Sequence, residues 1–277
     1  MSKFVRSFFA AALLCAVAIA ASAQPLPVAV EVSGNTANVR IGLAGAPLAN
    51  LRLDFDDASG LSAAALGISA ELVNIGHSGL LARLPDPLAV GIPASLPLLI
   101  TVEPPLLGGL SFRRQVHVEL HTHALAYTAG SRYRLLKAPL GGQFRDITGE
   151  VAPGSVRTRG TTGGWSQVLV VLDLRPTDTV VAEKIDYLRT QIAMLSAIEA
   201  TPLTAELNAV ETAVADQRYA AASAGIDAMR ARVSARAGTG IPDQWRATRD
   251  LNNLAGELQS GLDTLDFSIG FLRDHGL

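Results

Sequence analysis

The stretch Gln167–Leu195, QVLVVLDLRPTDTVVAEKIDYLRTQIAML, contains the change of pattern that decides the fold. Up to Leu172 it is a short, β-branched apolar run, which is typical of a buried strand. After Pro176 the apolar residues recur every three or four positions, as they do on one face of an amphipathic helix. The sequence therefore predicts a sheet-forming half that ends near Pro176 and a helix-forming half that follows it.

Before Pro176, short apolar segments alternate with Gly- and Pro-rich breaks, and no long helical pattern occurs. Ser33-Gly34-Asn35 separates the first two segments and is typical of a hairpin turn. Eight short strands without a long helix favour an antiparallel β-sandwich-like domain over residues 24–176. The predicted strands are Val28–Val32, Val39–Leu43, Leu51–Phe55, Ile68–Val73, Leu98–Val102, Phe112–Leu120, Tyr133–Leu136 and Gln167–Leu172.

After Pro176, the apolar spacing predicts an antiparallel helical bundle over residues 177–277, so that the fold class is α+β. Thr201-Pro202 is expected to open the second helix, as an N-cap followed by proline at the first helical position. Pro242 is expected to precede the last helix, which would then contain Trp245 and pack it against the bundle or at the seam between the domains. The apolar stripes are Val181, Ile185, Leu188, Ile192 and Leu195; Leu203, Leu207, Val210 and Val214; Tyr219, Ala222, Ile226, Met229 and Val233; and Leu251, Leu254, Leu258, Leu262, Leu265, Ile269 and Leu272.

Two resemblances to known proteins follow from short motifs. The helical part, with Ile185-x2-Leu188, Leu203-Thr-Ala-Glu-Leu207, an Ala-rich third helix and a Leu-rich last one, resembles the FIMAH helical domain of bacterial exported proteins. This resemblance implies an accessory or scaffolding module. The β part, with Phe144-Arg-Asp-Ile-Thr-Gly-Glu and Thr161-Thr-Gly-Gly-Trp165, resembles uncharacterised exported bacterial proteins, and it implies no activity.

The first 23 residues have the three parts of a secretory signal peptide. Lys3 and Arg6 supply positive charge, Phe8–Ala21 is apolar, and Ala21-Ser22-Ala23 is a small-x-small cleavage site. The apolar run is shorter than the roughly 20 residues that span a bilayer, and no later run approaches that length. The sequence predicts cleavage after Ala23, a periplasmic or secreted location and no membrane span in the mature chain.

Charge and cysteine content exclude several classes of function. The chain has 23 Lys and Arg against 25 Asp and Glu, and loss of Lys3 and Arg6 makes it more acidic, which disfavours nucleic-acid binding. Its one cysteine, Cys15, leaves with the signal peptide, so thiolate chemistry and disulfides are excluded. The sequence contains no phosphate-binding loop and no Gly-x-Ser-x-Gly elbow, and it predicts no cofactor.

Three histidines form the first candidate site. If Phe112–His123 is a strand, then His117, His121 and His123 point to one face of it. Residues two apart on a strand are separated by about 6.6 Å, so His121 and His123 could share one Zn²⁺ with a ligand from a neighbouring strand. His117 is about 20 Å from His123 along the strand and would join only through a bend. The alternative is a half-exposed strand whose solvent face holds histidines.

Trp165 is the second candidate. It follows Thr161-Thr162-Gly163-Gly164, which could present its ring at a loop tip, where a planar aromatic side chain stacks on a sugar. Alternatively, the ring anchors the start of a core strand.

The function predicted from these observations is that of an exported, non-enzymatic binding or scaffold protein with a protein or glycan partner in the envelope or outside the cell. Two alternatives are a metal-dependent hydrolase that uses the His117–His123 strand and a carbohydrate-binding module centred on Trp165. The oligomeric state is left open.

Overall fold

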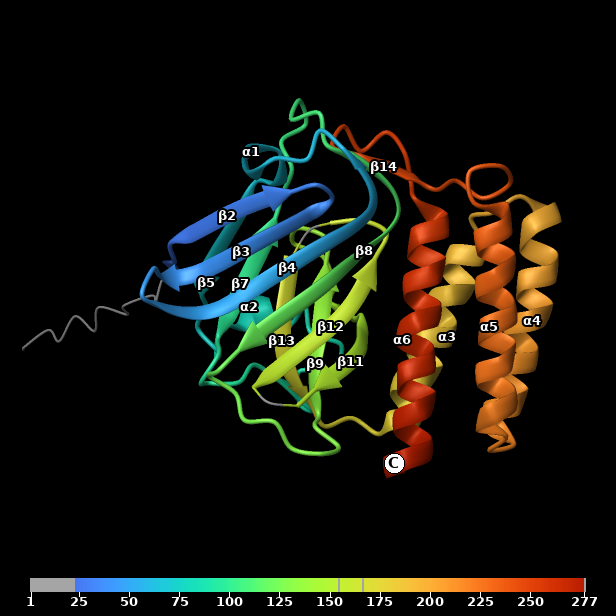
Figure 1. Ribbon diagram of the computed structural model, residues 1–277. Helices are drawn as coiled ribbons and strands as arrows, with labels where there is room; N and C mark the ends of the chain where they lie inside the picture. Colours follow the sequence, from blue (N-terminus) through green and yellow to red (C-terminus); the bar gives the residue numbers. More distant parts are fainter. Residues whose placement is uncertain (1–22, 154, 166, 277) are drawn as a thin grey trace, which may run out of the picture.

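The computed structural model describes residues 23–153, 155–165 and 167–276, and the predicted signal peptide lies outside them except for Ala23. The chain is a mixed α and β protein with two antiparallel sheets and four long helices (Figure 1). All described strands precede the long helices except β14 (Gln244–Arg246), which lies between the third and the fourth of them. The long helices begin after Pro176, where the sequence pattern changes. The prediction of a mixed fold with an antiparallel β part and a helical part is therefore confirmed.

Sheet A has the strand order β1-β5-β7-β13-β9-β10, and β6 also pairs with β13. Its central strand β13 is buried on both faces, as its continuous apolar run predicts. The strands of sheet A are β1 (Gln24–Pro25), β5 (Ile68–Leu72), β6 (Val90–Gly91), β7 (Leu98–Val102), β9 (Tyr133–Ala138), β10 (Arg145–Asp146) and β13 (Gln167–Asp173).

Sheet B has the order β11-β12-β8-β4-β3-β2, and β14 pairs with one end of β8. The predicted hairpin joins β2 and β3 through Gly34, whose φ of 56° is left-handed. The strands of sheet B are β2 (Val28–Ser33), β3 (Thr36–Leu43), β4 (Ala46–Ser59), β8 (Ser111–Thr122), β11 (Thr148–Ala152), β12 (Val156–Thr162) and β14 (Gln244–Arg246). Two short helices, α1 (Ala63–Leu66) and α2 (Ser78–Leu81), lie in connections.

The two sheets enclose one apolar core. Val116, Val118 and Leu120 of β8 alternate into it, together with Ile100 of β7 and Val170 of β13. An aromatic group closes the core at one end: Phe112 lies 5.6 Å from Phe55 and 6.0 Å from Trp165 between ring centroids. Alternation in sheet B thus directs one set of side chains inward and leaves His117 and Glu119 on its outer face.

The second half of the chain folds into α3 (Thr177–Ile192), α4 (Ala197–Ala215), α5 (Tyr219–Arg236) and α6 (Leu254–His275), which lie side by side (Figure 1). Their apolar stripes form a separate cluster, in which Leu188, Leu207, Ile226 and Leu262 are fully buried. These four helices confirm the helical spacing of the sequence. Among the described helices, none has the length and hydropathy that crossing a membrane requires.

One predicted helix start is wrong. The second helix begins at Ala197, and Pro202 lies inside it rather than at its first position. The Thr201 hydroxyl donates to the carbonyl of Ala197 at 2.8 Å instead of capping the helix. The proline removes the N–H that would bond the carbonyl of Ile198, a residue that is largely exposed, so water can replace the missing donor.

A second prediction, that Trp245 lies in the last helix, is also wrong. Pro242 precedes the strand β14, and α6 begins only at Leu254. Trp245 pairs with Phe112 of β8, and their rings stack at 5.1 Å between centroids. Burial of a tryptophan removes about 150–250 Å² of surface from water. The free energy gained by this burial is larger than the helix propensity of the few residues of one turn. The alternative expectation, that Trp245 lies at the seam between the two parts, agrees with this position.

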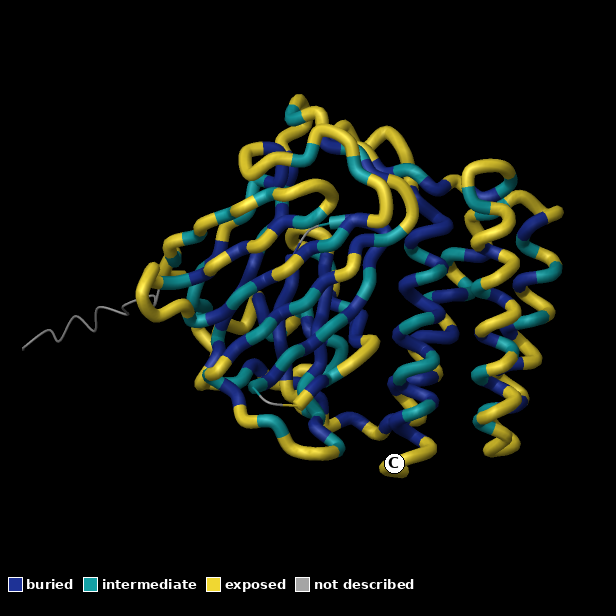
Figure 2. The backbone as a smooth tube through the Cα atoms, in the orientation of Figure 1, coloured by how far each residue is buried: buried dark blue, intermediate teal, exposed yellow. Residues whose placement is uncertain are grey.

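The helix α6 is the element that joins the two halves. It contacts β8, β11 and β12 on one side and α3 and α5 on the other. Its buried positions accordingly cover most of its circumference, whereas α4 and α5 are exposed along their outer sides (Figure 2). Asn253 fixes its start: the side chain accepts a hydrogen bond from the N–H of Gly256 at 2.9 Å and donates to the carbonyls of Arg114 and Gly163.

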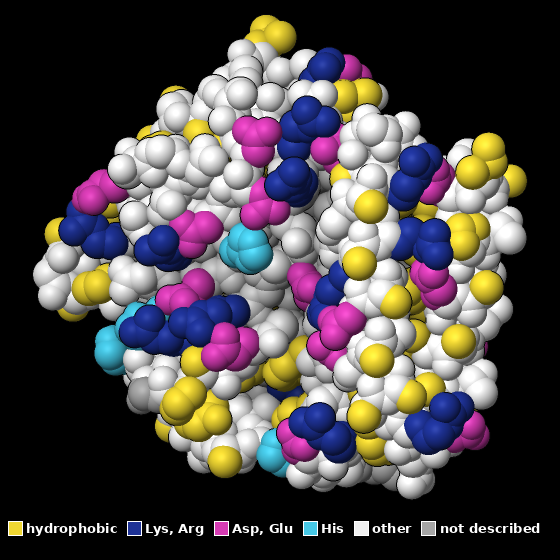
Figure 3. Space-filling view, turned by 45° about the vertical axis from the view of Figure 1, so that its right-hand side comes forward, with side chains coloured by type: hydrophobic (Ala, Val, Ile, Leu, Met, Phe, Trp, Pro, Cys, Tyr) yellow, Lys and Arg dark blue, Asp and Glu magenta, His cyan; other side chains and the backbone are white. Residues whose placement is uncertain are grey.

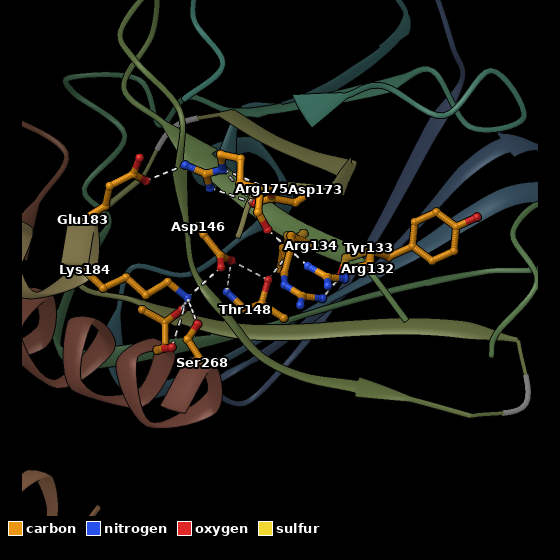
Figure 4. Close-up of polar contacts among 12 residues, drawn as sticks. Arg132, Tyr133, Arg134, Asp146, Thr148, Asp173, Arg175, Glu183, Lys184 and Ser268 are labelled. Carbon is orange, nitrogen blue, oxygen red and sulfur yellow. Dashed lines mark hydrogen bonds and ion pairs between the residues drawn. The ribbon is translucent and has the colours of Figure 1, made fainter. Parts of the chain in front are cut away.

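A buried polar network also fastens the sheets to the helices (Figure 4). Lys184 of α3 forms an ion pair with Asp146 of β10 at 2.6 Å, and both side chains are almost completely buried. The Lys184 ammonium also donates to Thr264 and Ser268 of α6. Because every donor of the ammonium has an acceptor, its burial between three elements is possible.

Candidate functional site

A cleft of about 540 Å³ opens at the seam between the sheets and the helices. We call it the seam cleft. The sheets contribute strands β9 and β10 and the loop between β12 and β13, and the helical half contributes α3, the loop after β14 and the start of α6. Its main lining residues are Lys137, Arg145, Trp165, Tyr187, Trp245 and Glu257.

The floor of the seam cleft is a cluster of charged side chains around Glu257. Its carboxylate accepts hydrogen bonds from Lys137 Nζ at 2.8 Å, from Tyr187 Oη at 2.6 Å and from Arg145 Nη2. Lys137 also donates to the Thr162 hydroxyl at 2.6 Å. One carboxylate of α6 therefore holds two cations and a phenol from three other elements, β9, β10 and α3.

Burial and charge shift the ionisation of this cluster. Burial by itself would raise the pKa of Glu257, but the adjacent Lys137 and Arg145 charges outweigh it and bring the pKa down to about 2. Burial lowers the pKa of Lys137 to about 8, and the attraction of Glu257 offsets only part of this effect. At neutral pH both groups are ionised.

Arg145 is held in a defined orientation but retains unused donors. Its guanidinium carbon lies 4.2 Å from the centroid of the Tyr187 ring, a stacked arrangement that arginine favours. One terminal nitrogen pairs with Glu257, whereas Nη1 is buried and has no hydrogen-bond partner among the described residues. A buried donor without an acceptor costs about 1–3 kcal/mol.

Both tryptophans of the chain line the seam cleft. Trp165 is partly exposed and packs against Phe55 at 5.6 Å between ring centroids. Its Nε1 is buried and lacks a partner within the described part of the chain. The structure thus combines features of both alternatives for Trp165: the ring anchors the end of the core and also forms a cleft wall.

Exposed apolar side chains surround the mouth of the cleft. Leu140 is 63% exposed and Met194 is 50% exposed, and Leu251 lies beside them. Apolar surface gathered around a cavity with few polar groups is typical of sites that bind small molecules.

Two glycines allow the cleft to be built this closely. A side chain at Gly163 would collide with the backbone of Gly256 and Glu257, so only glycine lets this loop approach the first turn of α6. A side chain at Gly164 would meet both Glu257 and Trp245. The Thr161-Thr-Gly-Gly-Trp165 motif therefore places Trp165 next to the charged floor.

His117 lies in a different place, a groove of about 510 Å³ on the outer face of sheet B. Figure 3 shows this face, where charged side chains of both signs gather on the sheet and on the facing helices. His117 Nε2 lies 3.2 Å from Asp56, and this carboxylate raises the pKa of His117. Across the groove, Arg230 pairs with Asp263 at 3.0 Å.

The structure brings His121 and His123 together but not His117. The first two rings lie 4.8 Å apart between centroids, and His121 also bonds the Ser155 hydroxyl. His117 is four residues away, about 13 Å along the strand, and faces Asp56. In residues 23–276, apart from the two undescribed positions, no three His, Cys, Asp or Glu side chains are placed to hold a metal ion.

Sequence reasoning missed Lys137, Arg145, Tyr187 and Glu257, which are distant in the chain and converge only through the fold. One signal was present: Glu257 lies three residues after Leu254 and one before Leu258, and so it directly borders the apolar stripe of the last helix. A carboxylate at such a position needs a buried partner.

Comparisons with known proteins identify a family. No curated protein and no solved structure matches this chain. The model of the family of unknown function DUF6689 matches residues 11–273, which is nearly the whole sequence. The chain therefore belongs to the DUF6689 family.

Proposed function

We propose that this protein is an exported, non-enzymatic binding protein that holds a small ligand in the seam cleft. The observation that carries the proposal is the composition of the cleft: a charged floor, two tryptophans in the walls and exposed Leu140 and Met194 at the mouth. A site of this volume with convergent polar groups and an apolar surround suits a low-molecular-weight ligand.

Binding is favoured over catalysis because the charged side chains of the cleft floor are already hydrogen-bonded to one another. Glu257 accepts three hydrogen bonds, so its carboxylate is a poor general base. Lys137 is held between Glu257 and Thr162. These contacts describe a rigid, pre-organised surface.

The architecture fits this role. We propose that residues 24–176 form a β-sandwich-like domain, to which β14 adds one strand, and that α3–α6 form a helical bundle domain within residues 177–277. The ligand would then lie where the domains meet, which is a common location of binding sites. The resemblance of the helical part to FIMAH domains, which implies an accessory module, and the predicted signal peptide of residues 1–23 support an exported binding protein.

The second candidate, a carbohydrate-binding module centred on Trp165, is favoured by the place of that ring in the cleft wall. A glycan array discriminates between the two. Glycan binding by the wild-type protein that is lost in Trp165→Ala, a variant that leaves the charged cleft floor unchanged, would support the sugar. The scaffold alternative would be supported by self-association, measured as mass over a range of concentrations.

The two tryptophans make the proposal directly testable, because both line the seam cleft and the tryptophan emission therefore reports on this cleft. The folded protein is titrated with a library of metabolites while tryptophan emission and melting temperature are recorded. A ligand of the cleft is expected to change both signals, since binding to the folded state raises its apparent stability.

A matched pair of variants locates the ligand. Met194→Glu places a charge on the apolar rim of the cleft, and Leu88→Glu makes the same kind of change at a 98% exposed position outside it. We expect binding to weaken in Met194→Glu and to persist in Leu88→Glu. A library in which no compound changes either signal, or ligands that ignore Met194→Glu, would refute a ligand site in this cleft.

A further inference from the structure

The floor of the seam cleft carries an excess of positive charge. Lys137 and Arg145 are both ionised at neutral pH, and Glu257 is their shared hydrogen-bonded carboxylate. At the rim, Arg249 and Glu103 form a second ion pair, which adds no net charge to the cleft. Two cations facing one anion leave a net charge of about +1 in a partly dehydrated space, where charges interact more strongly than in water.

The same floor also has more donors than acceptors. All the hydrogen bonds of Glu257 are made with protein groups, so it offers little to a ligand. Arg145 Nη1 and Trp165 Nε1, in contrast, are N–H donors that have no acceptor among the described residues. A ligand that brings acceptor oxygens would complete this arrangement once a small side-chain movement uncovers the two nitrogens.

The mouth of the cleft favours an apolar part of a ligand, because Leu140, Met194 and Leu251 expose apolar surface there. A ligand that matches both ends of the cleft has an acidic oxygen group at one end and an apolar body at the other. The cleft volume of about 540 Å³ is sufficient for a molecule of this size.

We propose that the ligand of the seam cleft is a small organic acid with an apolar body, whose carboxylate pairs with Arg145 and Lys137 while its body lies against Trp165 and the rim leucines. This inference rests on the proposed binding function and adds the chemical class of the ligand. Arginine suits the role because its planar guanidinium can bond a carboxylate with two nitrogens.

The experiment compares acids with isosteric neutral compounds on the folded, full-length mature protein. Phenylbutyrate and decanoate are titrated beside their primary amides, and beside a phosphate ester and a neutral oligosaccharide, by calorimetry and tryptophan emission. We expect each acid to bind at least about tenfold more tightly than its amide, since a hydrogen bond to a charged group is worth roughly 1.5–3 kcal/mol.

Two sets of variants assign the preference to the floor. Arg145→Gln removes the positive charge, and we expect it to abolish the difference between acid and amide, while Arg145→Lys keeps part of that difference. If Arg145→Gln does not fold, the exposed rim supplies a second test. Leu140→Gln and Leu140→Glu both remove an apolar rim contact, so both should weaken acids and amides to a similar degree. Only Leu140→Glu adds a negative charge, so we expect it to weaken acids about threefold or more beyond Leu140→Gln and to bind amides as Leu140→Gln does.

The possible failures are distinguishable. Amides, oligosaccharide or phosphate ester bound as tightly as acids would overturn the organic acid while leaving a binding protein. Acids that bind without responding to Arg145→Gln or Leu140→Glu would also overturn it. If no compound changes the calorimetric or fluorescence signal here and the wider library is equally silent, the proposed function falls together with this inference.

Discussion

At the scale of single residues, Glu257 is the side chain on which the seam cleft depends. It is the counter-charge of Lys137 and Arg145 and accepts from Tyr187, and its own side chain is only 18% exposed. Removing one partner of a buried charge pair leaves the others unpaired, which costs about 3–5 kcal/mol.

The low pKa of Glu257 gives this cost a dependence on pH. The pKa is about 2 in the folded state against an ordinary value of 4.5, so the carboxylate stabilises the fold fully above pH 4.5 and loses this effect as the pH falls towards 2. We expect the free energy of unfolding of wild type to exceed that of Glu257→Gln at pH 7, and the gap to narrow by about 2 kcal/mol at pH 3.

Urea denaturation at several pH values measures this gap. Glu31→Gln is the control, because Glu31 pairs with Arg40 in solvent and should contribute less than about 1 kcal/mol at any pH. A gap that stays constant from pH 7 to pH 3 would contradict the assignment.

The histidines permit a second prediction at this scale. Only His121 and His123 meet, and burial followed by the nearby Arg157 charge lowers the pKa of His121, which disfavours its protonated form. Two imidazoles without a third ligand hold Zn²⁺ weakly. We expect elemental analysis of protein dialysed after zinc loading to find less than one zinc per chain, with no change in a variant carrying His121→Ala and His123→Ala. Stoichiometric zinc that this variant loses would instead support the hydrolase alternative.

At the scale of elements, the sequence predicts most of what periodicity can reveal. Leu98–Val102 matches β7 in both bounds, and the stripe through Ile185 and Leu188 matches α3. The strand β12 was missed because its inward positions include Thr158, Gly160 and Thr162, so that its buried face contains few apolar residues. Its burial is decided by neighbours in the sheet, which a local pattern does not contain.

The position of β14 was missed for a related reason, and it supports a prediction about this element. Trp245→Ala removes the ring that stacks on Phe112 at 5.1 Å, and we expect a loss of about 3–5 kcal/mol in unfolding free energy. Trp245→Phe keeps an aromatic ring and should lose less. Hydrogen exchange should show faster exchange in β8, whose end pairs with β14. Unchanged stability in Trp245→Ala would mean that β14 is not held by its ring.

At the scale of the whole molecule, sequence patterns separate the two halves and the structure rejoins them. The network around Lys184 and Asp146 (Figure 4), the cap at Asn253 and the cluster around Glu257 all bridge sheet and helix. None of these contacts could be predicted, because each joins residues separated by more than 30 positions. The candidate cleft was therefore predictable only through Trp165.

This bridging predicts that the two halves unfold together. The far-UV helical signal follows α3–α6, while tryptophan emission follows the end of the sheet core. We expect both signals to give one coincident transition in urea, as a two-state domain does. Two separated midpoints would show that the helices melt independently of the sheets.

The return of the chain into sheet B also bears on how such a protein could be rearranged by recombination. A gene break after residue 176 would separate β8 from β14 and remove the ring that covers Phe112. The fragment that ends at residue 176 would expose the face of Phe112 that Trp245 covers, and it would leave the end of β8 without its partner strand. Exposed apolar surface and an unpaired strand edge both promote aggregation. The helical segment therefore cannot be transferred to another protein by itself. A protein that acquires this segment must also contain a sheet against which Trp245 can pack.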